Sequence, residues 1–369
     1  MSAAETLAMH VPHAFNAEDE AELELVLCCP DDSRIFEGTL NGDEEPARFF
    51  GDADEVCDPS PDLERADVDR MPFIRTMTGT PLSCLGHQVA GQAPLLKRED
   101  GKVCKPLVTR ERLFYEKIQR SHPEFLPFVP RFFGVSTVTL FLSECSVYDE
   151  KDEPLVENSN WGLNLFQRKL SRIANQSSTS LNAEYIVLQD LTCAYKHPCI
   201  LDLKIGTRQH GDSATEPKRR RMIERCESTT SAALGFRLCG LEVYHPSTCK
   251  YVYRDKYHGR RLSTADIQDA LLEYVNNGNR TRSELWGPFI RRLNQLSVLF
   301  EKQSAFRFYG SSLLFIYEGD ESLDSHVDVK MVDFANTYEI SDGVKEDDSG
   351  YLFGLTNILQ LITGLAESR

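Results

Sequence analysis

Two oppositely charged residues, Asp202 and Lys204, alternate with apolar residues in the stretch PCILDLKIG, residues 198–206. Successive side chains of a β-strand point to opposite faces, so the aspartate and the lysine share one face while Leu203 and Ile205 share the other. Charged groups on a buried strand need partners. The strand therefore carries either a structural ion pair or two groups that act on a charged ligand, and the pattern alone favours neither.

Cationic residues follow this strand at high density. Residues 196–261 hold 14 Lys and Arg against 7 Asp and Glu. Clusters of arginine and lysine suit a ligand rich in phosphate. A nucleic-acid surface is a weaker interpretation, because the acidic remainder of the chain discourages nucleic acid. The cationic residues directly after the strand are Arg208, His210, Lys218, Arg219, Arg220, Arg221 and Arg225.

An acidic residue, Asp333, follows a second apolar strand in the stretch MVDFA, residues 331–335. A carboxylate at such a position is a common way to hold a magnesium ion on nucleotide phosphates. A strand that bears a lysine, a cationic segment and a metal-binding acid together predict phosphoryl transfer to an anionic acceptor.

The stretch at 198–206 resembles the PxxxDxKxG signature of the inositol polyphosphate kinases. The resemblance covers the chain with gaps from about Gly86 to the C-terminus, and four blocks in the right order are hard to explain by chance. The words TRQHGD and KYHGR resemble the inositol hexakisphosphate kinase branch most. The blocks after the signature are KYHGR at 256–260, RFYGSSLL at 307–314 and VDF at 332–334.

The resemblance implies a two-lobed α+β fold, like that of protein kinases and related to ATP-grasp enzymes, with a helical substrate-binding insertion. It also implies a kinase that uses ATP and Mg²⁺ to convert a phosphate of inositol hexakisphosphate into a pyrophosphate, at the 5-position of the ring. The alternatives are a multikinase that acts on ring hydroxyls and a non-catalytic inositol-phosphate sensor or scaffold. Lys105, Lys204 and Asp333 speak against the sensor, since a pure binder needs no metal ligand.

On the nucleotide side, the resemblance implies that Lys105 holds the α- and β-phosphates of ATP and that Glu111 orients this lysine. Asp202 resembles the residue that pairs with the ribose hydroxyls. The segment from Glu184 to Leu191 resembles the hinge that contacts adenine, with Gln189 and Leu191 as its ATP-binding residues. Relatives often carry Glu in place of Gln189.

On the acceptor side, the resemblance implies that Asp333 binds magnesium with help from Ser312. Lys204 then lies between the γ-phosphate and the acceptor, and Lys204 and Asp333 are the catalytic residues. The predicted substrate-binding residues are Lys204, Arg208, His210, Lys218, Arg221, Arg225, Lys256 and His258.

The pairing of Lys105 with Glu111 also has support from the residues themselves. The lysine lies on a predicted strand, 101–107, and the glutamate on a predicted helix, 109–119. Protein kinases orient their phosphate-binding lysine in this way. Taken alone, Lys105 fits a surface lysine better. The helix shows an apolar stripe of Leu113, Phe114 and Ile118, with Glu111 on another side.

The mechanism follows partly from a missing motif. Protein kinases use an aspartate in an HRD-type loop to accept the proton of a hydroxyl acceptor, and this sequence has no such motif. A phosphate acceptor has a second pKa of about 6 and is largely deprotonated at neutral pH, so it needs no base. Asp202 is a candidate base for a hydroxyl, but its place near the hinge favours the ribose.

The net charge of −16 is concentrated in residues 1–70, which hold 20 acidic and 4 basic side chains. So little apolar surface predicts disorder there, and the acidic segment is a candidate site for protein partners. We assign residues 71–190 to an N-terminal lobe and 191–369 to a C-terminal lobe, with inositol-phosphate-binding helices near 213–235. A polar stretch at about 145–180 reads as an insertion.

The 11 cysteines form no CxxC pair, which argues against a zinc site or a disulfide framework and favours a reducing compartment. We see no signal peptide at the start of the sequence and no apolar stretch of about 20 residues that would span a membrane. The expected location is the cytoplasm, the nucleus or both.

The remaining elements are predicted from periodicity and turn residues. The predicted strands lie at 86–97 (two around a turn), 130–144, 184–191, 237–244 and 249–254, with central strands at 307–317 and 327–333. The predicted helices are 214–231, capped by Ser213, and 265–276, 283–303 and 351–365, with Leu285, Phe289, Leu293, Leu296 and Phe300 as the core face of the third.

Overall fold

The structure is a computed structural model, and it describes residues 74–76, 79–91, 93–141, 180–323, 326–340 and 348–368. The predicted disorder of residues 1–70 and almost all of the predicted insertion at 145–180 lie outside these residues, and both stay predictions.

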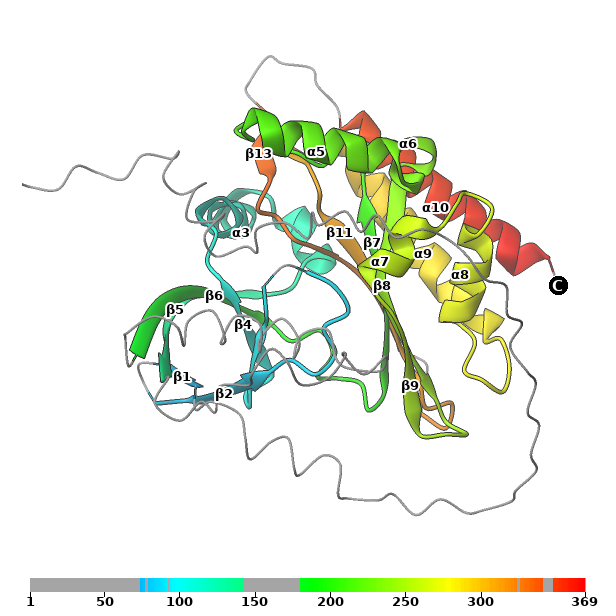
Figure 1. Cartoon of the computed structure of the whole chain (residues 1–369), viewed down its shortest axis with the longest axis horizontal. Helices are drawn as coiled ribbons and strands as arrows, with labels where there is room; N and C mark the ends of the chain where they lie inside the picture. Colours follow the sequence, from blue (N-terminus) through cyan, green and yellow to red (C-terminus); the bar gives the residue numbers. More distant parts are fainter. Residues whose placement is uncertain are drawn as a thin grey trace, which may run out of the picture. The chain divides into compact units, whose positions relative to one another are not determined.

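The first part of the described chain folds into a closed barrel of six strands, in the order β1-β2-β3-β4-β6-β5 (Figure 1). The barrel strands share a small apolar cluster of their own, which includes Leu82, Leu96, Cys104, Val138, Tyr185 and Val187. Val103 and Ile186 face the other way and join the large core. Helix α3 (Thr109–Ser121) follows β4, and a short 3₁₀ helix (Pro123–Phe128) leads into β5. The strands are β1 (Ile74–Thr76), β2 (Pro81–Cys84), β3 (Leu96–Arg98), β4 (Lys102–Pro106), β5 (Phe132–Phe141) and β6 (Ser180–Gln189).

The C-terminal part is built on an antiparallel sheet of five strands, in the order β12-β11-β7-β8-β9. Helices α8, α9 and α10 cover one face of this sheet, and the barrel lies on its other side (Figure 1). The strands are β7 (Pro198–Ile205), β8 (Phe236–His245), β9 (Lys250–Arg254), β11 (Ser312–Glu318) and β12 (Val327–Val332).

The helices of this part pack around the sheet in the places that the apolar pattern predicts. The predicted core face of the third helix is confirmed, since Phe289, Leu293 and Leu296 are at most 1% exposed. Within the described residues no helix is long and apolar enough to cross a membrane. The helices are α5 (Glu216–Glu227), α6 (Thr230–Leu234), α7 (Lys256–Arg261), α8 (Ile267–Tyr274), α9 (Trp286–Lys302) and α10 (Ser349–Glu367).

Three predictions for the C-terminal part are wrong. The helix expected over 214–231 is two helices, α5 and α6, and its cap residue is Thr215 rather than Ser213. The strand expected over 307–317 is broken at Gly310, which has a φ of +72°. As a result β10 (Phe306–Phe308) pairs with β13 (Thr337–Glu339) in a separate sheet, and β12 is an edge strand rather than a central one.

The segment between β2 and β3 was expected to begin with a strand at residue 86, but it forms a turn that packs on the C-terminal sheet. Tyr253 donates a hydrogen bond to the carbonyl of Gln88 at 2.8 Å. Val89 lies against Gly240, where a side chain would collide with its carbonyl. A bulge in β8 next to Gly240 opens this site, because Cys239 has no partner on β7.

A buried acid lies at the same contact. The Glu242 side chain is 4% exposed, and its Oε1 lies within hydrogen-bond distance of Nδ1 of His87, at 3.2 Å. Its second oxygen has no hydrogen-bond partner among the described residues. Burial raises the pKa of Glu242, although the hydrogen bond and charge of His87 oppose the shift.

The Glu242→Gln variant should show how this burial affects stability. An acid whose folded pKa lies above its unfolded value loses stability as pH rises from the unfolded pKa through the folded one. The unfolding free energy of the variant, relative to the wild type, should therefore increase as the pH rises from about 4.5 through the raised pKa of the folded state, as urea denaturation can measure. The exposed Glu339→Gln serves as control. Parallel pH curves for wild type and Glu242→Gln would contradict the prediction.

The joint between α6 and β8 requires glycine. Gly235 ends α6 with a φ of +72°, and a methyl group there would lie 2.6 Å from the backbone nitrogen of Gly354 on α10. Its carbonyl accepts the N–H of Gly206 at 2.7 Å. The close approach of the two backbones therefore connects α10 with the end of the signature strand.

We expect Gly235→Ala to lower the unfolding free energy by at least about 2 kcal/mol, because left-handed backbone strain of roughly 1–2 kcal/mol adds to the collision. The matched control is Gly364→Ala on α10, where the added methyl group meets no atom within 4 Å. That change should raise stability by about 0.5–1 kcal/mol. Equal effects of the two variants in thermal denaturation would disprove the argument.

Candidate active site

The signature strand β7 lies in the middle of the five-stranded sheet and presents Asp202 and Lys204 on one face. The antiparallel register places Lys204 opposite Ser312 of β11 and opposite Arg237 of β8. The Lys204 side chain runs over Gly310, because a methyl group at that glycine would lie 3.2 Å from Cε of the lysine. The absence of a side chain at Gly310, where the strand is interrupted, thus leaves room for the amine of Lys204.

Asp202 is a buried acid with incomplete partners. It is 6% exposed, and its Oδ1 has no hydrogen-bond partner among the described residues. Burial, followed by the nearby charge of Asp333, raises the pKa of Asp202 to about 7, against the opposing effects of Ser312, Lys204 and Arg237. An open acceptor of this kind suits a hydroxyl group of a ligand, which is the ribose role predicted for it.

Lys105 joins the barrel to the C-terminal sheet. Its Nζ lies 2.8 Å from Oε1 of Glu111 and 2.6 Å from Oδ1 of Asp333. The same Glu111 oxygen accepts the backbone N–H of Phe334 at 3.1 Å. Burial alone would lower the pKa of Lys105, but the two carboxylates outweigh it and raise the pKa above its ordinary value. The lysine is therefore a permanent cation.

Asp333 follows β12 in a left-handed backbone conformation, with a φ of +67°. Its side chain is 40% exposed. Loss of solvent around the Asp333 carboxyl group would raise its pKa, but the charge and hydrogen bond of Lys105 lower the pKa below its ordinary value. Non-glycine residues in this conformation gather at functional sites, because the rest of the fold has to stabilise the strain.

Helix α3 corrects one expectation about this group. Glu111 is completely buried and lies on the same face as Phe114 and Ile118, while Leu113 is 48% exposed. The predicted apolar stripe is therefore wrong at Leu113, and Glu111 shares the buried face of the helix instead of lying on another side. The burial of Glu111 is offset by Lys105 and by the Phe334 amide.

The signature loop, Thr207–Asp212, continues from β7 toward α5. Arg208 stacks on Tyr309 at 4.0 Å, donates to the carbonyl of His210 at 3.2 Å and pairs with Asp212. Partial burial lowers the pKa of His210, and the charges of Arg208 and Arg219 lower it further. His210 is thus neutral near pH 7 and can accept or donate one hydrogen bond.

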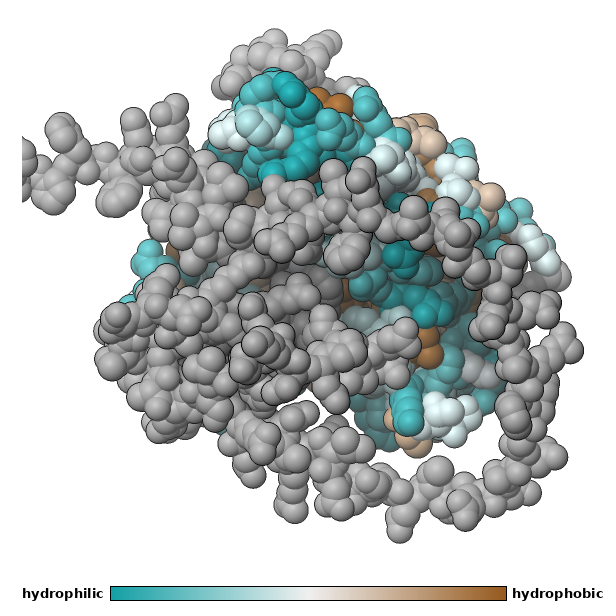
Figure 2. Space-filling view, in the orientation of Figure 1, coloured by the Kyte–Doolittle hydropathy of each residue, from teal (hydrophilic) through white to brown (hydrophobic). Residues whose placement is uncertain are grey.

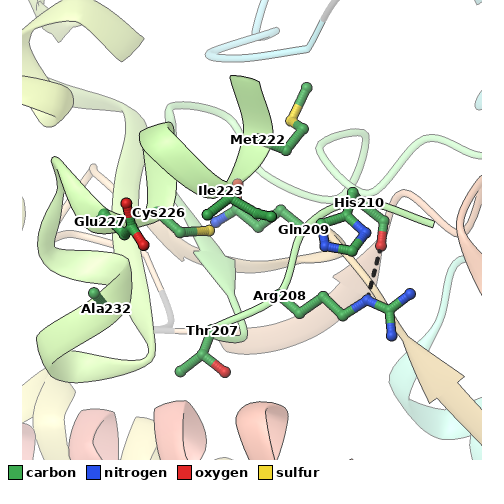
Figure 3. Close-up of a pocket in the computed structure, with 9 residues that line it drawn as sticks. All are labelled: Thr207, Arg208, Gln209, His210, Met222, Ile223, Cys226, Glu227 and Ala232. Atoms are coloured by element: carbon green, nitrogen blue, oxygen red, sulfur yellow. Dashed lines mark hydrogen bonds between the residues drawn. The ribbon is translucent and has the colours of Figure 1, made fainter. Parts of the chain in front are cut away.

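A cavity of about 340 Å³ lies between the signature loop and helices α5 and α6 (Figure 3). Its walls are partly apolar on the helix side and polar on the loop side. The lining residues are Thr207, Arg208, Gln209, His210, Met222, Ile223, Cys226, Glu227 and Ala232.

Helix α5 brings three predicted substrate-binding residues, Lys218, Arg221 and Arg225, to its partly buried side. Arg225 and Lys204 both lower the pKa of Cys226, which burial raises, so their charges lie near the same thiol. The surface over α5 is hydrophilic in Figure 2. The helix therefore adds positive charge on the side of Lys204.

The hinge connects β6 with β7. Gln189 is exposed at the end of β6, and its Oε1 lies 3.4 Å from the backbone nitrogen of Arg131. Leu191 packs instead against an apolar cluster of Val89, Ile200 and Ile316. Leu191 is thus partly buried against this cluster, while the Gln189 side chain faces solvent. The predicted contact of these two residues with adenine stays a prediction.

Comparison with known proteins agrees with this geometry. A family model described as inositol polyphosphate kinase matches residues 185–363. Inositol hexakisphosphate kinase 3 of Mus musculus is 30% identical, over 78% of this chain and 96% of its own length. This chain belongs to the inositol polyphosphate kinase family. Inositol hexakisphosphate kinase 2 of Rattus norvegicus is 29% identical, over 80% of this chain and 99% of its own.

A solved structure is also similar to this member of the family. It is the inositol phosphate multikinase of S. cerevisiae in complex with ADP and Mn²⁺, with a TM-score of 0.54 and 25% identity. It covers 72% of this chain and 99% of its own. The predicted two-lobed α+β fold is confirmed by this likeness.

The residues of this kinase fit a nucleotide with a divalent cation. Among the described residues no group of three or more His, Cys, Asp and Glu side chains could hold a metal ion unaided. Asp333 could hold one together with phosphate oxygens, which is how magnesium is usually bound. Ser312 hydrogen-bonds to Asp202, and its predicted help in binding the metal stays a prediction.

Two predicted substrate-binding residues of this kinase lie on a separate element, helix α7. Asp255 caps this helix through the N–H groups of Tyr257 and His258. Lys256 Nζ lies 5.0 Å from the ring centre of Tyr257. The helix packs on β8, where Gly259 lies against the carbonyl of Leu238. None of these contacts tests whether Lys256 or His258 binds the substrate, so that role stays a prediction.

Sequence reasoning missed several residues around the site. Asp190 is 1% exposed and accepts hydrogen bonds from the amide and hydroxyl of Thr192, at 2.8 and 2.6 Å, so it shapes the hinge. Arg237, opposite Lys204, looked like an ordinary strand residue. The signal that could have found both is a charged residue inside an otherwise apolar stretch.

We expect Asp333→Asn to weaken metal-dependent nucleotide binding about tenfold or more, since a contact with a charged group contributes roughly 1.5–3 kcal/mol. Calorimetric titration with ADP, in the presence and absence of Mg²⁺ or Mn²⁺, measures the effect. Binding without metal should change less. Asp328→Asn, on the same strand and 2.9 Å from Arg292, is the control. Unchanged metal-dependent binding would assign the ion to another acid.

Proposed function

We propose that this chain is an ATP- and Mg²⁺-dependent inositol hexakisphosphate kinase, which transfers the γ-phosphate of ATP to a phosphate of inositol hexakisphosphate. The product is a diphosphoinositol with its pyrophosphate at the 5-position. The proposal is supported by the place of Lys204, whose charge acts on Asp333 of the Lys105–Glu111–Asp333 group and also on Cys226 of the cationic α5. We assign the first group to the donor and α5 to the acceptor.

The residues of this site would act by positioning and by charge, the main terms in phosphoryl transfer. Lys105, held by Glu111, binds the α- and β-phosphates of the donor. Lys204 lies between the donor and the acceptor and stabilises the charge on the group in transfer. Asp333 holds the divalent cation, which neutralises phosphate oxygens when bound. Asp202 accepts hydrogen bonds from the ribose through its open oxygen.

The acceptor would be held by positive charge from the signature loop and α5. Lys204, Arg208 and Arg221 offer charge-assisted hydrogen bonds to ring phosphates, and His210 a neutral one. The transfer needs no general base, since an acceptor phosphate with a second pKa of about 6 is already ionised at neutral pH.

A kinase that acts on ring hydroxyls is the second candidate. The pKa of about 7 for Asp202 is what a general base for a hydroxyl requires. The solved relative described above is a multikinase by its title. In that case Asp202 would accept the hydroxyl proton instead of binding the ribose.

The test is incubation of the purified protein with ATP, Mg²⁺ and inositol hexakisphosphate, followed by phosphorus NMR of the products. We expect new pyrophosphate resonances, with coupling that assigns the 5-position, and none with Lys204→Ala. That variant should keep its affinity for ATP, because the lysine lies toward the acceptor.

Parallel samples contain an inositol trisphosphate in place of the hexakisphosphate. Phosphorylation of the trisphosphate alone would replace the proposal with the hydroxyl kinase. Binding of both inositol phosphates without turnover of either would replace it with a sensor or scaffold.

A further inference from the structure

Gln209 is the buried residue in the middle of the signature loop, with 3% of its surface exposed, between the partly exposed Arg208 and His210. Its Nε2 donates to the hydroxyl of Ser231 at 3.0 Å, and its Oε1 accepts from Nη1 of Arg237 at 2.5 Å. Arg237 also donates to the Ser231 hydroxyl at 3.1 Å. The three side chains form a closed triangle of hydrogen bonds, which we name the Gln209 triangle.

The triangle contains a buried charge with neutral partners. Arg237 is 5% exposed, and its described hydrogen bonds go to an amide and a hydroxyl. It lies directly opposite Lys204 in the β7–β8 ladder, so two like charges share one face. A buried guanidinium beside another cation costs free energy, which the nearby Asp202 carboxyl offsets in part. Leaving its hydrogen bonds unmade would cost more, so Arg237 holds the Gln209 side chain firmly.

Packing alone does not fix the signature loop. The cavity of about 340 Å³ lies between this loop and the helices α5 and α6 (Figure 3). The ends of the loop are closely packed, since Thr207 lies against Gly350 of α10 and Gly211 lies against Tyr338, but the middle of the loop borders this cavity. On that side the polar contacts of Gln209 carry much of the positioning.

The backbone of Gln209 also lies close to the transfer point. A Cβ atom added to Gly310 would lie 3.0 Å from the carbonyl oxygen of Gln209 and 3.2 Å from Cε of Lys204. The carbonyl, Gly310 and the Lys204 side chain thus meet in one contact. A shift of Gln209 would change the room that the lysine amine has.

We propose that the Gln209 triangle is a positioning device, which fixes the signature loop so that Arg208, His210 and Lys204 face the acceptor phosphates. Gln209, Ser231 and Arg237 act through these three residues. The proposal rests on the proposed function for the identity of the acceptor, but the anchoring of the loop can be tested without it.

The experiment compares Gln209→Met, which keeps the length of the side chain and removes its polar atoms, with Gln209→Glu, which keeps an oxygen facing Arg237. Hydrogen–deuterium exchange of the amides of Thr207–Asp212 reports the anchoring of the loop. Steady-state kinetics with inositol hexakisphosphate and ATP, together with ATP hydrolysis in the absence of an acceptor, separates the acceptor side from the donor side.

Gln209→Met should increase the exchange of these amides and raise the KM for inositol hexakisphosphate about tenfold or more, with a lower kcat for transfer. The KM for ATP and the hydrolysis of ATP without an acceptor should stay within about twofold, because the triangle lies away from the donor side. Gln209→Glu should restore most of the wild-type behaviour.

Gln303→Met is the matched control, since the Gln303 side chain is hydrogen-bonded to the backbone amide and carbonyl of Phe306. It should change stability without changing these ratios.

Wild-type exchange in Gln209→Met would overturn the proposal, and so would equal increases in the two KM values or a Gln209→Glu variant as impaired as Gln209→Met. If Gln209→Met fails to fold, Ser231→Ala replaces it in the same measurements, because it removes one side of the triangle. If the wild type turns over no inositol hexakisphosphate, the proposed function fails, and exchange in the signature loop still decides whether the triangle anchors it.

Discussion

The ion contact between Lys105 and Asp333 is the interaction on which the site depends, because it is made by two parts of the chain that are 228 residues apart. One partner belongs to barrel strand β4 and the other to the end of β12 in the five-stranded sheet. Glu111 completes the group from α3 and binds the Phe334 amide at the same time. The position of α3 is thereby coupled to the residue after Asp333.

Charge explains why this group needs the rest of the fold. A lysine between two carboxylates is stable as a cation, whereas burial and the nearby charge of Asp333 raise the pKa of Asp202 to about 7. The surrounding cations, Lys204 and Arg237, offset part of this shift. In phosphoryl transfer the phosphates bring further negative charge, and the positive charges of β7, β8 and α5 are then matched by it.

The sequence predicted the fold class through its resemblance to a known family. Periodicity predicted the helix after β4 and helices α8, α9 and α10, because it depends on local chain geometry. The pairing of Lys105 with Glu111 was also predicted, whereas the chemical roles of Lys105, Lys204 and Asp333 stay predictions. The side of α3 that Glu111 occupies was not predictable from periodicity, because its burial depends on Lys105 and Phe334, which come from other parts of the chain.

Other differences have the same kind of cause. The break at Gly310 lies at a close approach to the Lys204 side chain, which neighbouring residues do not reveal. The 214–231 helix is interrupted at Ser228 and Thr229, where the Thr229 hydroxyl donates to the carbonyl of Arg225 at 2.7 Å. The Gln209 triangle joins a loop, a helix and a strand. Arg237 looked unremarkable in the sequence, since a single charge on a strand is usual at a surface.

The barrel has a further consequence for how such chains can change in length. Strands β5 and β6 pair directly at their outer ends, Phe141 with Ser180, so residues 142–179 begin and end at neighbouring points of one sheet. The entropy of closing a loop rises only with the logarithm of its length, by about 0.6 kcal/mol for each doubling. Residues can therefore be gained or lost at this point during evolution with little effect on the barrel, and new binding surfaces can be acquired there without disturbing Lys105.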